Sequence, residues 1–562
     1  MTRTTIVTRR RRIVIWHTRE QRGRIMEGTG SDSALLGGAT STPSGRGGVA
    51  SLLAPSTMLM PAAGRGEASR ARFDRRVIVV ALTLFSVLMA FSARYGFHRD
   101  ELYFLDSARH LQASYVDQPV FTPLIARLSL ALFGLSLVGL HLWAALAGFG
   151  TVILGGLLAR ELGGGQRAQL MAAIGVATMP ALLAADHLTG PTAFDVLAWS
   201  GLALIAVRIG RTGDPRWWLA GGAVVGLGLT NKHSIAFLAL ALIIGTVLSG
   251  GWRLMCNRWF VAGAVLASVF TIPDLVWQAG HGWATVTMTR NLNVENGGAG
   301  RIANFVVGQV IMASLALVPV WATGVRFLWR SGRPAWKGLA WAYALLLVFF
   351  ALTTGSKIYY LLGAYVYLLA AGAVALEGWL AVGHRLRKLL AATALTTVAA
   401  VPLVLPVLPA DDIGWTYGVN QALAESVGWP GFVGTVAAAW HGLPAATRAR
   451  SVLIAQNYGE AGAINELGHS SGLPVVFGDQ NSGWWWMPAG MRPDAVVAIA
   501  PGPGDVTGFR GYLLGFFSSV RTLATVANDA GLHNQEWGGH IYLCTGLRHS
   551  WPSVWQALRH YG

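Results

Sequence analysis

Long apolar stretches separated by short polar turns dominate the chain from Val77 to Pro409. An α-helix needs about 20 apolar residues to cross a hydrocarbon core of roughly 30 Å, and most of these stretches approach that length. The pattern predicts an α-helical polytopic membrane protein with about eleven spans, near residues 77–96, 137–159, 167–187, 191–209, 217–231, 233–250, 259–278, 304–326, 338–354, 358–380 and 388–409.

The composition supports this fold class. Of the 562 residues, 53% are hydrophobic and 12% are charged, and the mean hydropathy is +0.48. Soluble globular proteins carry about a quarter charged residues, so this chain has about half of the usual density. Such a shortage of charge is expected where most side chains face lipid or one another.

Positive side chains are unevenly divided between the short loops. With the N-terminus in the cytoplasm, the short outer turns hold only Lys232 and Lys357. The five short inner loops then hold fourteen cations: Arg160, Arg167, Arg208, Arg211, Arg216, Arg253, Arg258, Arg326, Arg330, Arg333, Lys337, Arg385, Arg387 and Lys388. Because cytoplasmic loops carry the excess of Lys and Arg, we expect a multi-pass plasma-membrane protein with the N-terminus inside and the C-terminus outside.

The net charge of +17 invites a nucleic-acid-binding interpretation, which the distribution excludes. Residues 1–76 carry fourteen Arg and five acids, a net +9, ahead of the first span, and much of the rest lies in loops. This is a positive-inside pattern, not a phosphate-binding surface. The stretch itself has few large apolar residues and no period, so we expect a disordered basic cytoplasmic tail.

From Asp411 onward the apolar runs shorten to strand length, with helical patterns between them. We therefore expect a small extracytoplasmic α/β domain over residues 411–562, after a membrane domain over 77–410. Its expected strands lie at residues 451–455, 474–477, 495–500 and 540–544. The two cysteines, Cys256 and Cys544, fall on opposite sides of the membrane in this topology, which excludes a disulfide framework.

The first outer loop, residues 97–136, is too long to be a turn. Its apolar residues recur every three positions after "FHRDE", which predicts a helix lying in the interface plane, and "TPLIARLSLALFG" (122–134) predicts a second. The second outer loop, residues 279–303, is rich in Gly and Asn, and we expect it to be mobile.

Ionisable residues gather at the outer ends of the spans. Because polar groups at membrane depth usually face a cavity or one another, their number on one side predicts a shared water-filled cleft. They are Asp100, Glu101, Asp117, Asp186, His187, Asp195, Lys232, His233 and Lys357.

Each of these residues also has a structural interpretation. Asp100 can cap the interfacial helix, whereas capping explains Glu101 less easily, and Asp117 can be a turn residue before a proline. Lys232 and Lys357 can extend to the lipid headgroups. A structural role is favoured for the other acids and the histidine between them, Asp186, His187 and Asp195.

Acids and cations at headgroup level suit one kind of chemistry, transfer from a lipid phosphate. A carboxylate can take the proton from an acceptor hydroxyl as it attacks, and a Lys or Arg can stabilise the departing phosphate. A lipid-linked donor would lie in the bilayer with its head in the cleft, which accounts for both charges and for their depth.

Four stretches resemble one superfamily: "RDELYFLDSARHL", "YVDQPVFTPLIARL", "GLGLTNKHSIAFLAL" and "GSKIYYLLGAYVYLLAAGA". They are similar to C-type glycosyltransferases that use polyprenyl-phosphate sugars, in the branch of the protein O-mannosyltransferases and the lipid A aminoarabinose transferase. The likeness covers roughly residues 77–380. The tail, with "AQNYGEAGAINELG" and "GDQNSGWWW", also resembles the outer domain of bacterial members.

The resemblance implies an inverting transfer of mannose, or another hexose or pentose, to a hydroxyl on the outer face. Asp100 would be the general base, with Glu101 supporting it. Asp117 matches the second acidic or basic position of the loop, but Val120 replaces a second proline that usually follows. The acceptor would be an envelope glycan, a lipid or a protein.

By position, Lys232 and Lys357 are the candidates for donor phosphate contacts, with Arg99 or Arg94 as further choices. His233 and Tyr359 adjoin these lysines and complete the expected substrate-binding set, together with Asp117 and Arg99. Some relatives in the superfamily use a divalent cation, which would lie beside Asp100 and Glu101. No ligand spacing in the chain supports one, and no other cofactor is implied.

Two other functions are compatible with a polytopic chain. A transporter or flippase for a lipid-linked sugar or small solute would show repeated halves and polar groups at the midplane, and neither is evident. A cell-wall binding module on a membrane anchor would not need eleven spans. The three adjacent Trp in "NSGWWWMP" (481–488) can stack on sugar rings, although packing within the protein is favoured.

Overall fold

The computed structural model describes residues 71–295, 300–500, 502, 506–528 and 530–562. Most of the predicted basic tail, residues 1–76, therefore lies outside the described residues. Residues Glu67–Gly562 form one compact unit. The boundary predicted at residue 410 stays a prediction.

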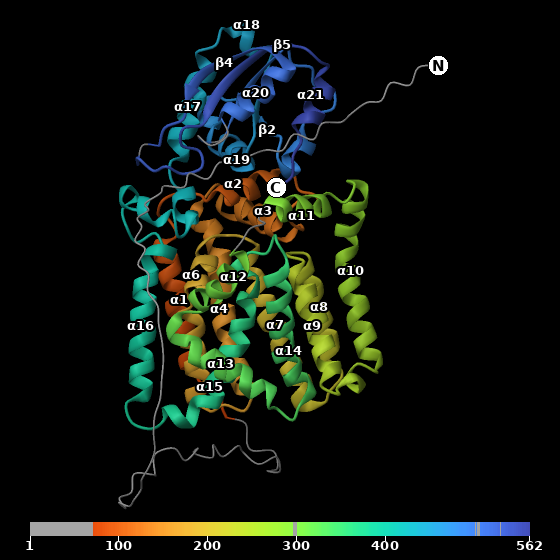
Figure 1. Cartoon of the computed structure of the whole chain (residues 1–562), viewed down its shortest axis with the longest axis vertical. Coiled ribbons are helices and arrows are strands. Elements are labelled where there is room, and N and C mark those ends of the chain that lie inside the picture. The colour runs from red at the N-terminus through yellow and green to blue at the C-terminus, as the bar shows by residue number, and fades with distance from the viewer. Residues whose placement is uncertain (1–70, 296–299, 501, 503–505, 529) are drawn as a thin grey trace, which may run out of the picture. The chain divides into compact units, whose positions relative to one another are not determined.

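The apolar part of the chain is helical throughout, as predicted (Figure 1). Six helices are long and apolar enough to cross a membrane: α4 (Leu137–Glu161), α7 (Pro191–Thr212), α10 (Arg258–Gly280), α14 (Pro334–Leu352), α15 (Leu362–Leu380, preceded by the turn η3, Ile358–Leu361) and α16 (Arg385–Val404). Two bent pairs raise this number to eight among the described residues: α5 (Gln166–Ala177) with α6 (Pro180–His187), and α12 (Arg301–Met312) with α13 (Val318–Trp329).

Three more predicted spans correspond to shorter helices. They are α1 (Arg76–Phe91), α8 (Trp217–Leu229) and α9 (Ser234–Leu248), with 16, 13 and 15 residues. Every predicted span thus has a helical counterpart, while the count of eleven spans stays a prediction. The bends have local causes: the breaks of 62° and 84° occur next to Pro180 and near Ser314, whose φ is +71°.

The centre of the bundle is α15, which packs against α4, α5, α7 and α13. Small residues let it approach α13 closely, because a Cβ at Gly324 or Gly372 would overlap the backbone of the opposite helix. By contrast, α10 and α16 lie at the periphery (Figure 1), with 17% and 6% of their apolar windows buried. These two helices therefore present most of their apolar surface outward, as expected for lipid contact.

The C-terminal α/β region (residues 411–562) contains the predicted α/β fold. Its five-stranded sheet has the order β2-β1-β3-β5-β4, with β1, β2 and β3 parallel and β4 and β5 antiparallel. The strands are β1 (Ser451–Ala455), β2 (Val476–Gly478), β3 (Ala495–Ile499), β4 (Phe517–Thr525) and β5 (His540–Leu547). Sequence reasoning missed the edge strand β4, because it buries few of its side chains and shows no apolar run.

Helices cover both faces of this sheet. Alternate residues of β1, β3 and β5 point to opposite sides, as the period of a strand requires. One face packs against α17 (Trp429–His441) and α19 (Tyr458–Leu467), and the other packs against α20 (Val506–Phe516) and α21 (Trp551–Leu558). A short helix, α18 (Ala445–Arg448), leads into β1.

Both helices predicted in the first outer loop are present, as α2 (Arg99–Arg109) and α3 (Phe121–Phe133). However, α2 packs against α19 of the C-terminal α/β region, so its face is covered by protein. The second outer loop differs from the expectation of a mobile segment: residues Ala284–Glu295 form α11. The helix contains no Gly or Pro, because the glycines of the loop lie before it, at 280 and 282, and after it, at 297, 298 and 300. Residues 296–299 lie outside the described residues.

Candidate active site

The start of α2 fixes the two adjacent acids through a capping box. The backbone N–H of Asp100 donates to His98 Nδ1 at 3.1 Å, and the backbone N–H of His98 donates to Glu101 Oε2 at 2.9 Å. His98 is therefore the cap, and both sequence interpretations are corrected: Asp100 does not cap the helix, and Glu101 takes part in capping. An acid in the third helical position reaches back to the cap residue, which leaves the acid before it directed outward.

Glu101 is fully buried and faces the helical bundle. Its Oε1 accepts a hydrogen bond of 2.7 Å from the backbone N–H of Thr189 and lies 2.9 Å from Nε2 of His141. Burial raises the pKa of Glu101, but His141 and the backbone donors of His98 and Thr189 outweigh it and hold this pKa below its usual value. The ionised Glu101 thus ties α2 to α4 and to the turn between α6 and α7.

Asp100, in contrast, is open to solvent. Its side chain is 44% exposed, and the hydroxyl of Tyr458 donates to Oδ1 at 2.8 Å. Arg99 Nε lies 3.8 Å from the same oxygen, and His98 Nδ1 lies 4.0 Å from Oδ2. Within the described part of the chain, Oδ2 accepts no hydrogen bond, so one oxygen of this carboxylate is held and the other is available.

Asp117 lies close enough to Asp100 for the two carboxylates to interact. The hydroxyl of Tyr103, on α2, donates to Asp117 Oδ1 at 2.6 Å. Burial raises the pKa of Asp117 to about 6, and the charge of Asp100 contributes to this increase. The second acid of the loop is therefore easily protonated, whereas its hydrogen bond to Tyr103 fixes its position.

The predicted cation Lys232 lies in a cage of aromatic and acidic groups. Its Nζ lies 5.0 Å from the ring centroids of both Tyr359 and Tyr360 and 4.0 Å from Asp195 Oδ2. Its side chain is 21% exposed. The hairpin between α8 and α9 and the turn η3 before α15 thus bring two predicted residues, Lys232 and Tyr359, together.

Two hydrogen bonds link the hairpin between α8 and α9 to the first outer loop. The N–H of Phe121 donates to the carbonyl of Thr230 at 2.8 Å, and Thr122 Oγ1 lies 3.2 Å from Asn231 Oδ1. The first outer loop, which carries both Asp100 and Asp117, is therefore in direct contact with the hairpin that carries Lys232.

Three other predicted site residues lie outside the cage around Lys232. His233 Nε2 lies 2.9 Å from Asp274 Oδ2, whose other oxygen accepts a 2.5 Å hydrogen bond from Ser114. Arg99 is directed towards the C-terminal α/β region, with Nη1 3.6 Å from Glu425 Oε1. Lys357 is exposed and forms no ion pair with a residue that the structure describes.

The residues that sequence reasoning missed are the partners of the acids: Tyr458, Tyr103 and His141. Tyr458 belongs to the C-terminal α/β region, 358 positions from Asp100. The only local signal is an Asn before a small-residue helix, "NYGEAGAINELG", which marks a helix start but not its target.

The acid pair does not fit a divalent ion. Both oxygens of Glu101 are already occupied by donors from inside the protein, which leaves only Asp100 with a free oxygen. Among the described residues, no group of three or more His, Cys, Asp or Glu side chains is placed to hold a metal.

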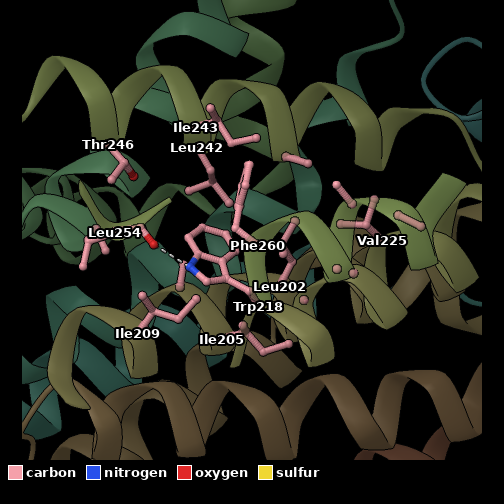
Figure 2. Close-up of a pocket in the computed structure, with 18 residues that line it drawn as sticks. Leu202, Ile205, Ile209, Trp218, Val225, Leu242, Ile243, Thr246, Leu254 and Phe260 are labelled. Carbon is pink, nitrogen blue, oxygen red and sulfur yellow. Dashed lines mark hydrogen bonds between the residues drawn. The ribbon is translucent and has the colours of Figure 1, made fainter. Parts of the chain in front are cut away.

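An apolar cavity of about 260 Å³ lies between α7, α8, α9 and α10. Figure 2 shows Leu202, Ile205, Trp218, Leu242 and Phe260 around it, and the indole N–H of Trp218 donates to the carbonyl of Leu254 at 2.8 Å. None of the predicted site residues lines this cavity, so it is separate from the acidic and cationic groups described above.

Part of the chain matches the model of a known protein family. Residues 117–277 match the model of the family described as dolichyl-phosphate-mannose-protein mannosyltransferase. A search of curated proteins gives no match. The matched segment contains Asp117, the Lys232 hairpin and Asp274, but it begins after Asp100.

Two solved structures of ArnT share the fold over most of the chain. ArnT from Cupriavidus metallidurans bound to undecaprenyl phosphate matches with a TM-score of 0.55 and 15% identity, covering 83% of this chain and 97% of that chain. ArnT in the apo state matches with the same TM-score and coverage and 16% identity. The oligosaccharyltransferase AglB from Archaeoglobus fulgidus matches with a TM-score of 0.43 and 12% identity, covering 71% of this chain and 64% of that chain.

These findings agree with the expected enzyme class, a glycosyltransferase, and with the expected membrane fold. Residues 117–277 thus match the dolichyl-phosphate-mannose-protein mannosyltransferase family model, and most of the chain shares the fold of ArnT, which agrees with the resemblance to C-type glycosyltransferases that the sequence indicates.

Proposed function

We propose that this protein is a membrane glycosyltransferase that moves a sugar from a polyprenyl phosphate to a hydroxyl group, with Asp100 as general base. The observation that carries the proposal is the contrast between the two carboxylate oxygens of Asp100. Oδ1 is held by Tyr458, while Oδ2 is unoccupied on a half-exposed side chain, and the later part of the same outer loop contacts the hairpin that carries Lys232. This is the arrangement that a base needs opposite a leaving phosphate.

The reaction is a single displacement with inversion. Oδ2 of Asp100 takes the proton of the acceptor hydroxyl, and the acceptor oxygen forms a bond to the anomeric carbon. The bond between that carbon and the phosphate oxygen breaks, and its electron pair stays on the polyprenyl phosphate. A positive group near the departing oxygen stabilises the new charge, and Lys232 is the caged cation in reach of this region.

The donor side is assigned to Lys232, Tyr359 and Lys357. Tyr359 is partly exposed beside the ammonium group, and Lys357 is an exposed cation two residues earlier. The undecaprenyl phosphate in the similar ArnT structure supports a lipid phosphate as the donor head. The acceptor is a hydroxyl of an envelope glycan, a lipid or a protein.

The two remaining loop residues act through Asp100. Glu101 supports the base by holding the first turn of α2 in place. Asp117 accepts a hydrogen bond from Tyr103, and its pKa is about 6. It therefore repels a nearby negative charge above that pH, where it is ionised, and not below it. His233 contributes by orienting Asp274 and, through Ser114, the loop after α2.

The test is Asp100→Asn in the full-length protein reconstituted in liposomes with a radiolabelled polyprenyl-phosphate sugar. We expect transfer to fall at least about 100-fold, because general-base catalysis typically contributes 10²–10⁴-fold. The matched control is Asp494→Asn, an acid with a 66% exposed side chain in a surface ion pair with Arg450, which should keep wild-type transfer.

Wild-type transfer by Asp100→Asn would contradict the assignment of the base. Movement of the labelled lipid or sugar across the bilayer without a covalent product would instead identify a transporter.

A further inference from the structure

Helix α19 of the C-terminal α/β region begins directly above the candidate base. Asn457 caps this helix by accepting a 2.7 Å hydrogen bond from the N–H of Gly459, and Tyr458 is its first residue. The backbone N–H of Tyr458 donates to Gln480 Oε1 at 3.1 Å. The position of the Tyr458 side chain is therefore fixed by the backbone on both sides of it.

Small residues allow α19 to lie very close to α2. A Cβ on Gly459 would overlap the Arg99 side chain, and one on Gly462 would lie 2.5 Å from the carbonyl oxygen of Leu102. Side chains at both positions would push the helices apart. The sequence "YGEAG" thus encodes a close contact that no local pattern reveals.

Ion pairs and polar contacts lock the two helices in register. Arg109 binds Glu466 through two hydrogen bonds of 2.5 and 2.7 Å, and the Glu466 side chain is fully buried. Asn465 Nδ2 donates to Asp106 Oδ2 at 3.1 Å. The contact is therefore specific along the whole length of α2.

The phenol of Tyr458 reaches the base from this platform. Its hydroxyl donates to Asp100 Oδ1 at 2.8 Å, and its ring centroid lies 4.9 Å from that of Tyr103. The guanidinium carbon of Arg99 lies 5.4 Å from the Tyr458 ring centroid. The ring is held between an aromatic and a cation, so the hydroxyl has little freedom to leave the carboxylate.

We propose that Tyr458 is a positioning residue for Asp100, so that the C-terminal α/β region completes the active site. The inference rests on the proposed function. By holding Oδ1, Tyr458 turns Oδ2 towards the acceptor. The other titratable groups facing Asp100 are His98, Arg99, Asp117 and Tyr359, and a Tyr458→Phe substitution leaves all of them in place.

The experiment compares Tyr458→Phe with the wild-type protein in liposomes, using the labelled polyprenyl-phosphate sugar over a range of pH. We expect the maximal rate to fall about tenfold, as for loss of one hydrogen bond to a charged group. The acid limb of the pH–rate profile should move to higher pH, because the carboxylate loses one hydrogen-bond donor. The KM for the donor should not change.

The matched control is Tyr512→Phe in the same α/β region. Its hydroxyl donates to the carbonyl of Ala557 at 2.6 Å, and the residue is exposed. Transfer and its pH profile should match the wild type. A second, isosteric probe is 3,5-difluorotyrosine at position 458, whose more acidic hydroxyl is a stronger donor and should move the acid limb to lower pH.

Each outcome tests either the inference about Tyr458 or the proposed function. If Tyr458→Phe keeps the wild-type rate and profile while Asp100→Asn is inactive, the inference is wrong and the proposed function stands. A lower rate with an unmoved acid limb in both variants at position 458 would also overturn it, since that indicates a structural role. If Asp100→Asn is active, the proposed function itself fails.

Discussion

Two neighbouring acids show how different the roles of adjacent residues can be at the scale of single side chains. Asp100 and Glu101 point away from each other, because successive residues of a helix lie about 100° apart. One is half exposed and holds a free oxygen, while the other is buried and accepts hydrogen bonds from His98 and Thr189. Both side chains are carboxylates, so only their burial and their hydrogen-bond partners distinguish the candidate base, Asp100, from the supporting residue, Glu101.

We predict that Glu101→Gln destabilises the protein by about 3–5 kcal/mol, because it breaks the buried pair that Glu101 forms with His141. Thermal unfolding in detergent is the measurement, and Asp100→Asn is the matched control, with a change under about 1 kcal/mol. Equal stabilities of the two variants would contradict the structural role of Glu101.

The same substitution has a predictable pH dependence. The pKa of Glu101 is lowered on folding, so the folded protein binds fewer protons than the unfolded chain near the usual value of 4.5. Its stabilising contribution is therefore present above that pH and is lost as the pH falls below it. Glu101→Gln should lose less stability than the wild type on acidification, in the same unfolding experiment.

At the scale of elements, the contact between α2 and α19 decides the site. Helix α2 carries the base, and α19 carries the residue that holds it. Neither helix is notable alone: α2 has an apolar stripe, and α19 is a short helix between two strands of the sheet. The polar pairs along their contact, rather than their individual stability, set the geometry of Asp100.

We predict that Arg109→Ala loosens this contact at a cost of about 1–3 kcal/mol, because the buried Glu466 loses both hydrogen bonds. Hydrogen exchange should increase in both helices. Arg450→Ala is the control, since Arg450 and Asp494 form a pair whose side chains are each 66% exposed. Unchanged exchange in Arg109→Ala would show that the pair does not hold the two helices together.

At the scale of the whole molecule, the function requires the C-terminal α/β region and the base to face the same side of the membrane. From the charge distribution we expect the loop containing Cys256 to lie in the cytoplasm and residues 411–562 to lie outside. The structure makes this testable with cysteine chemistry, because Cys256 is exposed and Cys544 is buried.

We predict that a membrane-impermeant maleimide labels Cys256 only after the cells are permeabilised. An Asp494→Cys variant, changed at an exposed surface position, should be labelled in intact cells. The buried Cys544 should react in neither case. Labelling of Cys256 in intact cells would reverse the proposed orientation.

Much of the architecture could be predicted because it depends on local patterns. Hydropathy alone gives the helical stretches, and short apolar runs give four of the five strands. The acidic pair after the first span also stands out, since charge is costly there. By contrast, the edge strand β4 and the helix α11 were missed, because neither carries a long apolar run.

The sequence by itself determined the membrane class, the distribution of charge between loops and the candidate base Asp100, since each follows from the solvation of individual segments. Only the tertiary structure decided which residues serve that base. Tyr458 reaches it from 358 positions away, and His233 is directed to Asp274 instead. Such pairings depend on how separately stable elements dock, and docking is set by shape and by buried polar pairs that no single segment contains.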